Sequence, residues 1–218
     1  LYDSTDIYMR HFNTVLSSFG KAPVTTKDFR GRFLASGATE TLKRAGIGEN
    51  DVLEARRQFI ELTRGEPRPN LFHDAADTLR WLKARGIDVV IASAHPSQDI
   101  YETLRKYDLM KFVFGVHGGM TPEGKVKVTN TIITTRGLPP DELVLVDDMD
   151  LVLERARSIG CRLVASARGY CSQERLLKVR PDKIIHNLKN LQGYINLIEY
   201  TQPQNLPENS KIRKRSGR

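Results

Sequence analysis

Hydrophobic side chains return every three or four positions along the first part of the chain, which is the spacing of an amphipathic helix. The clearest run, from Ile7 to Phe19, predicts a helix that Asp3 or Ser4 caps and Gly20 ends. Weaker helical patterns follow over residues 27–35, 38–45 and 50–64. This part of the chain ends in GEPRPN, whose Gly, Pro and Asn content is typical of a linker. We therefore expect an all-α segment before the linker.

After the linker, short apolar runs alternate with amphipathic stretches. Strands are predicted for IDVVIAS, KFVFGV, LVLVDD, CRLVAS and DKIIH. Helices are predicted for DAADTLRWLKARG, PSQDIYETLRKYDL, VKVTNTIITTRG, MDLVLERARSIG and NLKNLQGYINLIEY. Strands that alternate with helices form parallel sheets covered on both faces, and the runs VVIA and LVLV are apolar throughout, as buried strands are. The predicted fold class is therefore α/β, with a doubly wound parallel sheet.

Charge adds one feature to this picture, a basic C-terminal tail. The chain of 218 residues has a net charge of +8, and residues 201–218 hold five Lys and Arg residues against one Glu. The run KIRKR is either a patch for nucleic acid or targeting, or part of a solvated, disordered tail. No aromatic residue is interleaved with these charges, as binding of single-stranded nucleic acid would require. We therefore expect a disordered tail and no nucleic-acid partner.

The cysteines and the hydropathy pattern bear on the compartment. Cys161 and Cys171 show no metal-binding spacing and no redox motif, so we expect two unpaired thiols in a reducing cytosol. No apolar run approaches the ~18 residues of a membrane-spanning helix. The prediction is a cytoplasmic protein with no membrane partner.

Polar residues follow two of the predicted strands, at the carboxyl edge where open α/β sheets bind ligands. Ser93 follows IDVVIA and precedes a predicted helix, where a hydroxyl, loop N–H groups and the helix dipole can bind a phosphate together. The alternative is that Ser93 only begins the turn or caps the helix.

Two adjacent carboxylates follow the strand LVLV. Asp147 and Asp148 repel each other there unless a cation or a positive side chain compensates. Carboxylate oxygens suit Mg²⁺, which often takes one or two carboxylates together with a substrate phosphate. A single Asp would be explained as a cap of the next helix, but the pair favours a metal site.

A lysine lies between these two sites in the sequence. Lys125 follows a Pro-Glu-Gly turn and opens a helix, where the helix dipole disfavours a positive charge. It either neutralises an acidic or phosphoryl group or is an ordinary surface lysine, and Lys127 competes for the same role. His73, His95 and His117 lack the pairing that metal ligation requires, although His95 lies close to Ser93.

In this order, a Ser at a strand end, a Lys at a helix start and an acidic pair at the next strand end resemble motifs two to four of the haloacid dehalogenase (HAD)-like hydrolase superfamily. LFHDAADTLRWLKARGIDVVIASAHP resembles the approach to the second motif, and GKVKVTNTIITTRGLPPDELVLVDDMD resembles the third and fourth. LVLERARSIGCRLVA resembles the helix and strand that follow. The resemblance covers about residues 1–195, and its spacing favours Lys125 over Lys127.

The resemblance implies a HAD-like Rossmannoid parallel sheet with an inserted all-α cap of the phosphoglycolate-phosphatase-like kind. It implies a helical cap at 1–68, an α/β core at 69–200 and a tail at 201–218. In the family, the first motif is a strand that ends in Asp-x-Asp-x-Thr and lies between the strands that here end at Ser93 and Asp147. LYDSTDIY resembles the segment after that motif, so we expect the motif upstream of Leu1. Without that strand, two unpaired strand edges are expected.

The implied activity is that of a Mg²⁺-dependent phosphatase acting on a small phosphorylated metabolite through an aspartyl-phosphate. Ser93, the adjacent Ala94 and Lys125 would contact the phosphoryl group, and Asp147 and Asp148 would hold Mg²⁺.

The sequence also departs from the family pattern. Asp147 occupies a position that is often Gly, and Val152 one that is often Asp, which leaves open which carboxylate contacts the ion. In the cap, Arg30, Arg32 and Arg44 are possible anion contacts. The alternatives are a non-catalytic HAD-like binding module, or a nucleic-acid-associated protein that uses the basic tail.

Overall fold

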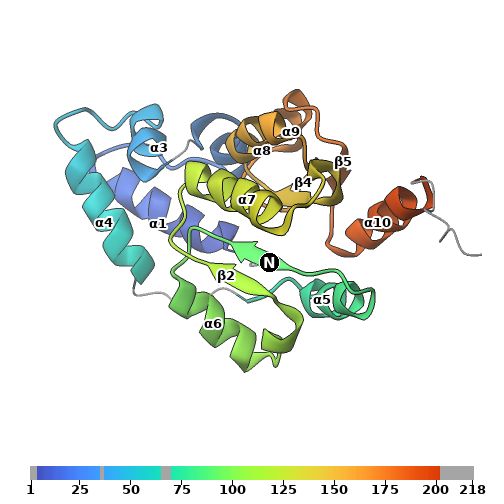
Figure 1. The fold of residues 1–218 in the computed structure, drawn as a ribbon. Coiled ribbons are helices and arrows are strands. Elements are labelled where there is room, and N and C mark those ends of the chain that lie inside the picture. Colours follow the sequence, from blue (N-terminus) through green and yellow to red (C-terminus); the bar gives the residue numbers. More distant parts are fainter. Residues whose placement is uncertain (1–3, 35–36, 65–69, 202–218) are drawn as a thin grey trace, which may run out of the picture.

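The computed structural model describes residues 4–34, 37–64 and 70–201 (Figure 1). The first part is helical, as predicted. Its helices are α1 (Thr5–Ser18), α2 (Thr26–Asp28), the π-helical turn η1 (Phe29–Phe33), α3 (Ala38–Arg44) and α4 (Val52–Arg64). The side chain of Ser4 does not cap α1 as predicted, because its hydroxyl forms a 2.6 Å hydrogen bond with the Tyr170 hydroxyl. The alternative cap, Asp3, lies outside the described residues.

The second part alternates strands and helices, which confirms the α/β fold class. Its strands are β1 (Val90–Ala92), β2 (Gly115–His117), β3 (Val144–Asp147), β4 (Arg162–Ser166) and β5 (Lys183–Ile185). Its helices are α5 (Ala75–Ala84), α6 (Ser97–Lys106), α7 (Pro122–Arg136), α8 (Asp150–Ala156), α9 (Gln173–Lys178) and α10 (Lys189–Thr201). Short 3-10 turns follow at η2 (Met110–Phe112), η3 (Pro140–Glu142) and η4 (Arg157–Ile159).

All strand pairs are parallel, but the strands form two separate sheets. β1 pairs with β2, with Ile91 opposite Val116. β3, β4 and β5 form the second sheet, with Leu145 opposite Leu163. Within the described ranges β1 and β3 are not hydrogen-bonded to each other, as expected if a strand belongs between them.

The burial of β3 fits this open edge. The centre of β4, Leu163–Ala165, is fully buried, whereas the side chains of Val144–Val146 in β3 are only half-buried. A strand with neighbours on both sides and helices on both faces would be covered along its length. The exposure of β3 therefore agrees with one unpaired side.

One local prediction was wrong, and one helix was not predicted. KFVFGV was predicted as one strand, but its first residues form η2, and only Gly115–His117 pair with β1. An apolar run of this length does not distinguish a strand from a buried turn, and here Leu109 and its neighbours pack on Leu104 and Ile100. Helix α9 was not predicted because it is short, and Ser172 fixes its start by accepting a hydrogen bond from the Arg175 N–H.

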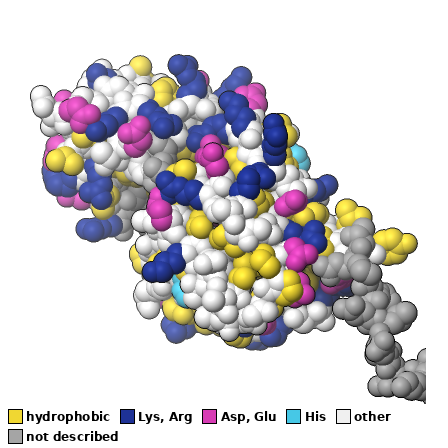
Figure 2. Space-filling model, turned by 45° about the horizontal axis from the view of Figure 1, so that its top comes forward, with side chains coloured by type: hydrophobic (Ala, Val, Ile, Leu, Met, Phe, Trp, Pro, Cys, Tyr) yellow, Lys and Arg dark blue, Asp and Glu magenta, His cyan; other side chains and the backbone are white. Residues whose placement is uncertain are grey.

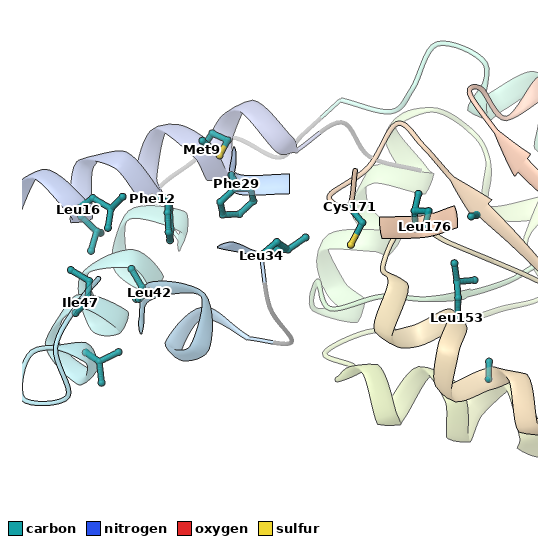
Figure 3. Close-up of a cluster of buried hydrophobic side chains, with 14 of the residues drawn as sticks. Met9, Phe12, Leu16, Phe29, Leu34, Leu42, Ile47, Leu153, Cys171 and Leu176 are labelled. Carbon is teal, nitrogen blue, oxygen red and sulfur yellow. The ribbon is translucent and has the colours of Figure 1, made fainter. Parts of the chain in front are cut away.

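The largest hydrophobic cluster extends from the helical part into the α/β core. On one side it contains Phe12, Phe29 and Leu34, and on the other Cys171 and Leu176. Figure 3 shows Leu34 lying between these two groups. The predicted boundary at residue 68 stays a prediction, but the described residues of the two parts share one continuous core.

The remaining predictions about the whole chain have mixed outcomes. Cys161 and Cys171 are both free, as predicted, and both are buried. Across the described ranges, no helix has the length and apolarity to cross a bilayer. Of the predicted tail, residues 201–218, Thr201 ends α10 and the rest lies outside the described residues. On the face drawn in Figure 2, basic side chains are interspersed with acidic ones rather than gathered into one stripe.

We expect Phe12→Ala to lower the free energy of unfolding by about 3–5 kcal/mol. Phe12 is 2% exposed and lies edge-on to Phe29 with ring centroids 5.0 Å apart, so truncation leaves a cavity in the helical part. Urea denaturation followed by circular dichroism measures the change. The control is Leu53→Ala, because Leu53 is 71% exposed and should change stability by no more than about 0.5 kcal/mol. Equal effects of the two variants would contradict this packing.

Candidate active site

Lys125 is directed at the end of β3 by the first turn of α7. Thr121 caps this helix by accepting a hydrogen bond from the Gly124 N–H, and Pro122 is its first residue. The Lys125 Nζ lies 2.8 Å from Oδ2 of Asp147, and the two side chains are 14% and 6% exposed. The structure therefore pairs Lys125 with the acidic pair, whereas Lys127 is exposed.

Asp147 has both carboxylate oxygens engaged by the protein. Its Oδ2 accepts the hydrogen bond from Lys125, and its Oδ1 accepts one of 2.9 Å from the Met149 N–H. Burial raises the pKa of this carboxyl, Lys125 acts in the opposite direction, and the neighbouring Asp148 raises the pKa further. The contact with Lys125 thus offsets part of the cost of burying this carboxylate.

Asp148 is held by the loop that follows β4. Its Oδ2 accepts a 2.8 Å hydrogen bond from the Tyr170 N–H, and its backbone oxygen accepts one from the Cys171 N–H. A Cβ on Gly169 would lie 1.8 Å from Oδ2 of Asp148, so only glycine allows this approach. Among the described residues, no hydrogen-bond donor reaches the other oxygen, Oδ1. The structure gives α8 no side-chain cap, so capping does not explain Asp148.

Ser93 lies directly after β1, and its hydroxyl oxygen accepts a 3.2 Å hydrogen bond from the His95 N–H. The turn interpretation of this serine is therefore correct, but it uses the oxygen only as an acceptor. The hydroxyl proton remains able to donate to a ligand. The exposed Ala94 follows, and its N–H donates to no other described residue.

Tyr8 of α1 contacts both the loop after β1 and the loop after β4. Its ring lies edge-on to His95, with centroids 6.4 Å apart, and edge-on to Tyr170, with centroids 5.6 Å apart. Burial lowers the pKa of His95, and the charge of Lys125 lowers it further. The loop after β1 and the loop after β4 therefore both contact one aromatic side chain of the helical part.

The three arginines predicted as anion contacts have other partners. Arg30 donates from Nη2 to the backbone oxygens of Ala167 and Cys171, at 2.6 and 3.1 Å. Arg44 pairs with Glu40, and Arg32 lies over the ring of Phe33. Their role toward an anion stays a prediction.

Sequence reasoning missed the loop that holds Asp148. Gly169 and Tyr170 follow β4 in the segment SARGYC, and both touch either Asp148 or the helical part. Its position in the sequence could have identified this loop, because it follows the carboxyl end of β4, the strand next to β3. A glycine after such a strand marks a place where another group comes close to the backbone.

The two carboxylates are the only metal-binding chemistry that the described site offers. Across residues 4–34, 37–64 and 70–201, no group of three or more His, Cys, Asp or Glu side chains is arranged to hold an ion. Mg²⁺ does not need such a group, because it commonly takes one or two carboxylates and completes its shell with water and substrate phosphate. The donor set therefore fits Mg²⁺ and not a structural zinc site.

Known proteins resemble this chain in sequence and in fold. The phosphoglycolate phosphatase 1 of Pseudomonas aeruginosa is 25% identical over 203 residues, which cover 88% of this chain and 74% of that protein. The phosphoglycolate phosphatase of Aliivibrio fischeri is 23% identical, with 90% and 92% covered. Among solved structures, a haloacid dehalogenase-like hydrolase from Streptococcus pneumoniae superposes with a TM-score of 0.72 at 20% identity, covering 88% and 91%. One from Bacteroides fragilis does so with 0.71 at 23%, covering 88% and 94%.

The family model described as haloacid dehalogenase-like hydrolase matches residues 1–166, which is more than half of the chain. Its match includes Ser93, Lys125, Asp147 and Asp148. The protein with this site therefore belongs to the haloacid dehalogenase-like hydrolase family.

Proposed function

We propose that this protein is a Mg²⁺-dependent phosphatase of a small phosphorylated metabolite. The observation that carries the proposal is the contact of Lys125 with Asp147, next to Asp148, at the end of β3. Ser93 follows β1, and its backbone oxygen accepts a hydrogen bond from the N–H of Met120, just before the helix that carries Lys125. A hydroxyl donor, a buried lysine and an oxygen-donor pair are the groups that phosphoryl transfer requires around the transferred group.

We propose an aspartate nucleophile on a strand between β1 and β3. In the family, this strand carries Asp-x-Asp-x-Thr, and its first Asp forms an aspartyl-phosphate that water then hydrolyses. Among the described residues, β1 pairs only with β2 and β3 only with β4, and the side chains of β3 are half-buried, which supports this position. The nucleophilic carboxylate at the end of such a strand would lie between Ser93 on one side and Asp147 on the other.

The binding residues would act on the transferring phosphoryl group. The Ser93 hydroxyl would donate to one phosphoryl oxygen and the Ala94 N–H to another, close to the positive N-terminal end of α6. The Lys125 ammonium has three N–H donors and uses one of them for Asp147. Its other donors can stabilise the charge that develops on the phosphoryl oxygens.

We assign the Mg²⁺ ligand to Asp148 and a positioning role to Asp147. Asp148 keeps Oδ1 without a donor among the described residues, whereas both oxygens of Asp147 are used by Met149 and Lys125. When bound, Mg²⁺ would shield the negative charges of the substrate phosphate and of the attacking carboxylate.

The substrate class follows from the relatives and the helical part. Several relatives are named phosphoglycolate phosphatase, so 2-phosphoglycolate is the first substrate to test. We propose that residues 1–68 act as a cap over the core of 69–200, with Tyr8 on the face toward the site. The two free thiols agree with the reducing cytoplasm that we propose as its compartment.

The two alternatives lack a comparable observation. A non-catalytic module would not need a buried lysine on the acidic pair. On the face drawn in Figure 2, basic side chains are mixed with acidic ones. A direct comparison of nucleic-acid binding by the full chain and by residues 1–200 would test the tail.

We expect the protein produced from its full open reading frame to hydrolyse p-nitrophenyl phosphate and 2-phosphoglycolate, and to lose this activity in EDTA. Restoring Mg²⁺ should restore turnover, because Lys125 is already paired with Asp147 and the charges of the phosphate and of Asp148 would call for the ion. Release of inorganic phosphate measures the reaction. The proposal fails if the codons before Leu1 encode no apolar strand followed by Asp-x-Asp-x-Thr.

Loss of a residue that only supports a metal ligand typically costs roughly 10–100-fold in metal affinity or activity. Asp148→Asn should reduce Mg²⁺-dependent turnover by more than that, because it removes the ligand itself. Asp147→Asn should instead lower kcat and leave the half-saturating Mg²⁺ concentration near the wild-type value, because its role is to hold Lys125. Steady-state kinetics over a Mg²⁺ series separate the two effects. Wild-type turnover in Asp148→Asn would refute this metal assignment.

Gly169→Ala should raise the half-saturating Mg²⁺ concentration by about 10–100-fold, because the added methyl group displaces the Asp148 carboxylate. Gly193→Ala is the matched control, since its Cβ would meet nothing within 4 Å. The same Mg²⁺ series measures both variants. An unchanged Mg²⁺ dependence in Gly169→Ala would show that the position of Asp148 does not matter for the ion.

A further inference from the structure

An ion pair outside the proposed chemistry lies beside the acidic pair. Arg175 of α9 makes a bidentate contact with Asp150, from Nε to Oδ2 at 2.8 Å and from Nη2 to Oδ1 at 2.9 Å. The two side chains are 17% and 22% exposed. Asp150 is the first residue of α8, two positions after Asp148, so this contact is anchored on the same turn.

The third nitrogen of Arg175 reaches the helical part. Its Nη1 donates to the backbone oxygen of Leu34 at 2.9 Å and to that of Arg30 at 3.2 Å. Arg30 reaches back, since its Nη2 donates to the oxygens of Ala167 and Cys171 in the loop after β4. We call Arg30, Asp150 and Arg175 the arginine clasp.

The clasp joins the same elements that the hydrophobic cluster joins. Leu34, 7% exposed, points toward Cys171 and Leu176, which are fully buried (Figure 3). Hydrophobic contact is not directional, so it can hold the two parts together without fixing how they are oriented. A planar guanidinium that satisfies one carboxylate and two carbonyl oxygens requires one orientation.

We infer that Arg175 is a positioning residue that couples the placement of residues 29–34 to the turn carrying Asp147 and Asp148. When residues 29–34 lie against α9, the two cap carbonyls complete the donor geometry of Arg175, and Arg175 in turn holds Asp150. When residues 29–34 move away, Arg175 loses two backbone acceptors. Its guanidinium then has more freedom to move, so it fixes the Asp150 carboxylate less firmly. The clasp itself is independent of the proposed phosphatase function, and only its effect on turnover rests on that function.

The sharpest variant is Arg175→Lys. Lysine keeps the positive charge opposite Asp150, which avoids leaving a partly buried carboxylate unpaired. It cannot reach the carboxylate in a bidentate way and the two carbonyl oxygens as well. Hydrogen–deuterium exchange of the full-length protein, read by mass spectrometry, reports on residues 29–34 without any assay of activity.

Arg175→Lys should speed amide exchange in residues 29–34 and 167–172 by about tenfold, the size expected for loss of one charge-assisted hydrogen bond. Asp150→Asn is the second variant and should speed exchange in the same segments. Arg157→Lys is the matched control, because Arg157 donates to the backbone oxygens of Val179 and Arg180 at the end of α9 and has no described partner in the helical part. It should leave both segments at the wild-type rate.

Unchanged exchange in folded Arg175→Lys would overturn the inference. Equal acceleration by Arg157→Lys would also overturn it, because a general loosening of α9 would then be the cause. If the protein is a phosphatase, Arg175→Lys should raise the half-saturating Mg²⁺ concentration, and the Arg157→Lys control should not. If it has no phosphatase activity, the exchange result still decides whether the clasp exists.

Discussion

The buried ion pair between Lys125 and Asp147 is the constraint on which the site depends. Taking two charges out of water costs several kcal/mol per ion, which is comparable to the net free energy of unfolding of a whole domain. Good geometry and further hydrogen bonds must offset this cost. Here the Met149 N–H supplies the further hydrogen bond to Asp147. The ion pair therefore forms only if the start of α7 and the end of β3 keep their positions relative to each other.

This constraint reaches Ser93 through the loop that leads into α7. The N–H groups of residues 118–120 donate to three acceptors in the loop after β1: the Ser97 hydroxyl, the His95 carbonyl and the Ser93 carbonyl. A Cβ on Gly118 would lie 2.1 Å from the Ser97 backbone nitrogen, so the two loops are in direct contact. A shift of Lys125 would thus move the Ser93 loop as well, and the site behaves as one connected unit.

The residues at strand ends could be predicted from the sequence, and the residues that hold them could not. Ser93 follows an apolar strand and Asp147 ends one, and parallel strands bring their carboxyl ends to one edge, so the sequence predicts both residues at the same edge. The helix at α7 was also predictable despite its threonines, whose hydroxyls at Thr129, Thr134 and Thr135 fold back onto carbonyls four residues earlier. By contrast, the contacts of Gly169 and Arg175 join positions up to 145 residues apart and leave no periodic signal.

The acidic pair divides two demands that one carboxylate could not meet. A residue that balances a buried lysine must have its oxygens engaged, whereas a metal ligand must keep an oxygen available when the ion arrives. Asp147 meets the first demand, and Asp148, with the Tyr170 N–H on one oxygen only, meets the second. Asp147 is the last residue of β3 and Asp148 follows it, and the two side chains have different neighbours: Asp147 contacts α7 and Asp148 contacts the loop after β4. In the proposed site, the adjacent pair would therefore hold a lysine and an ion side by side on different oxygens.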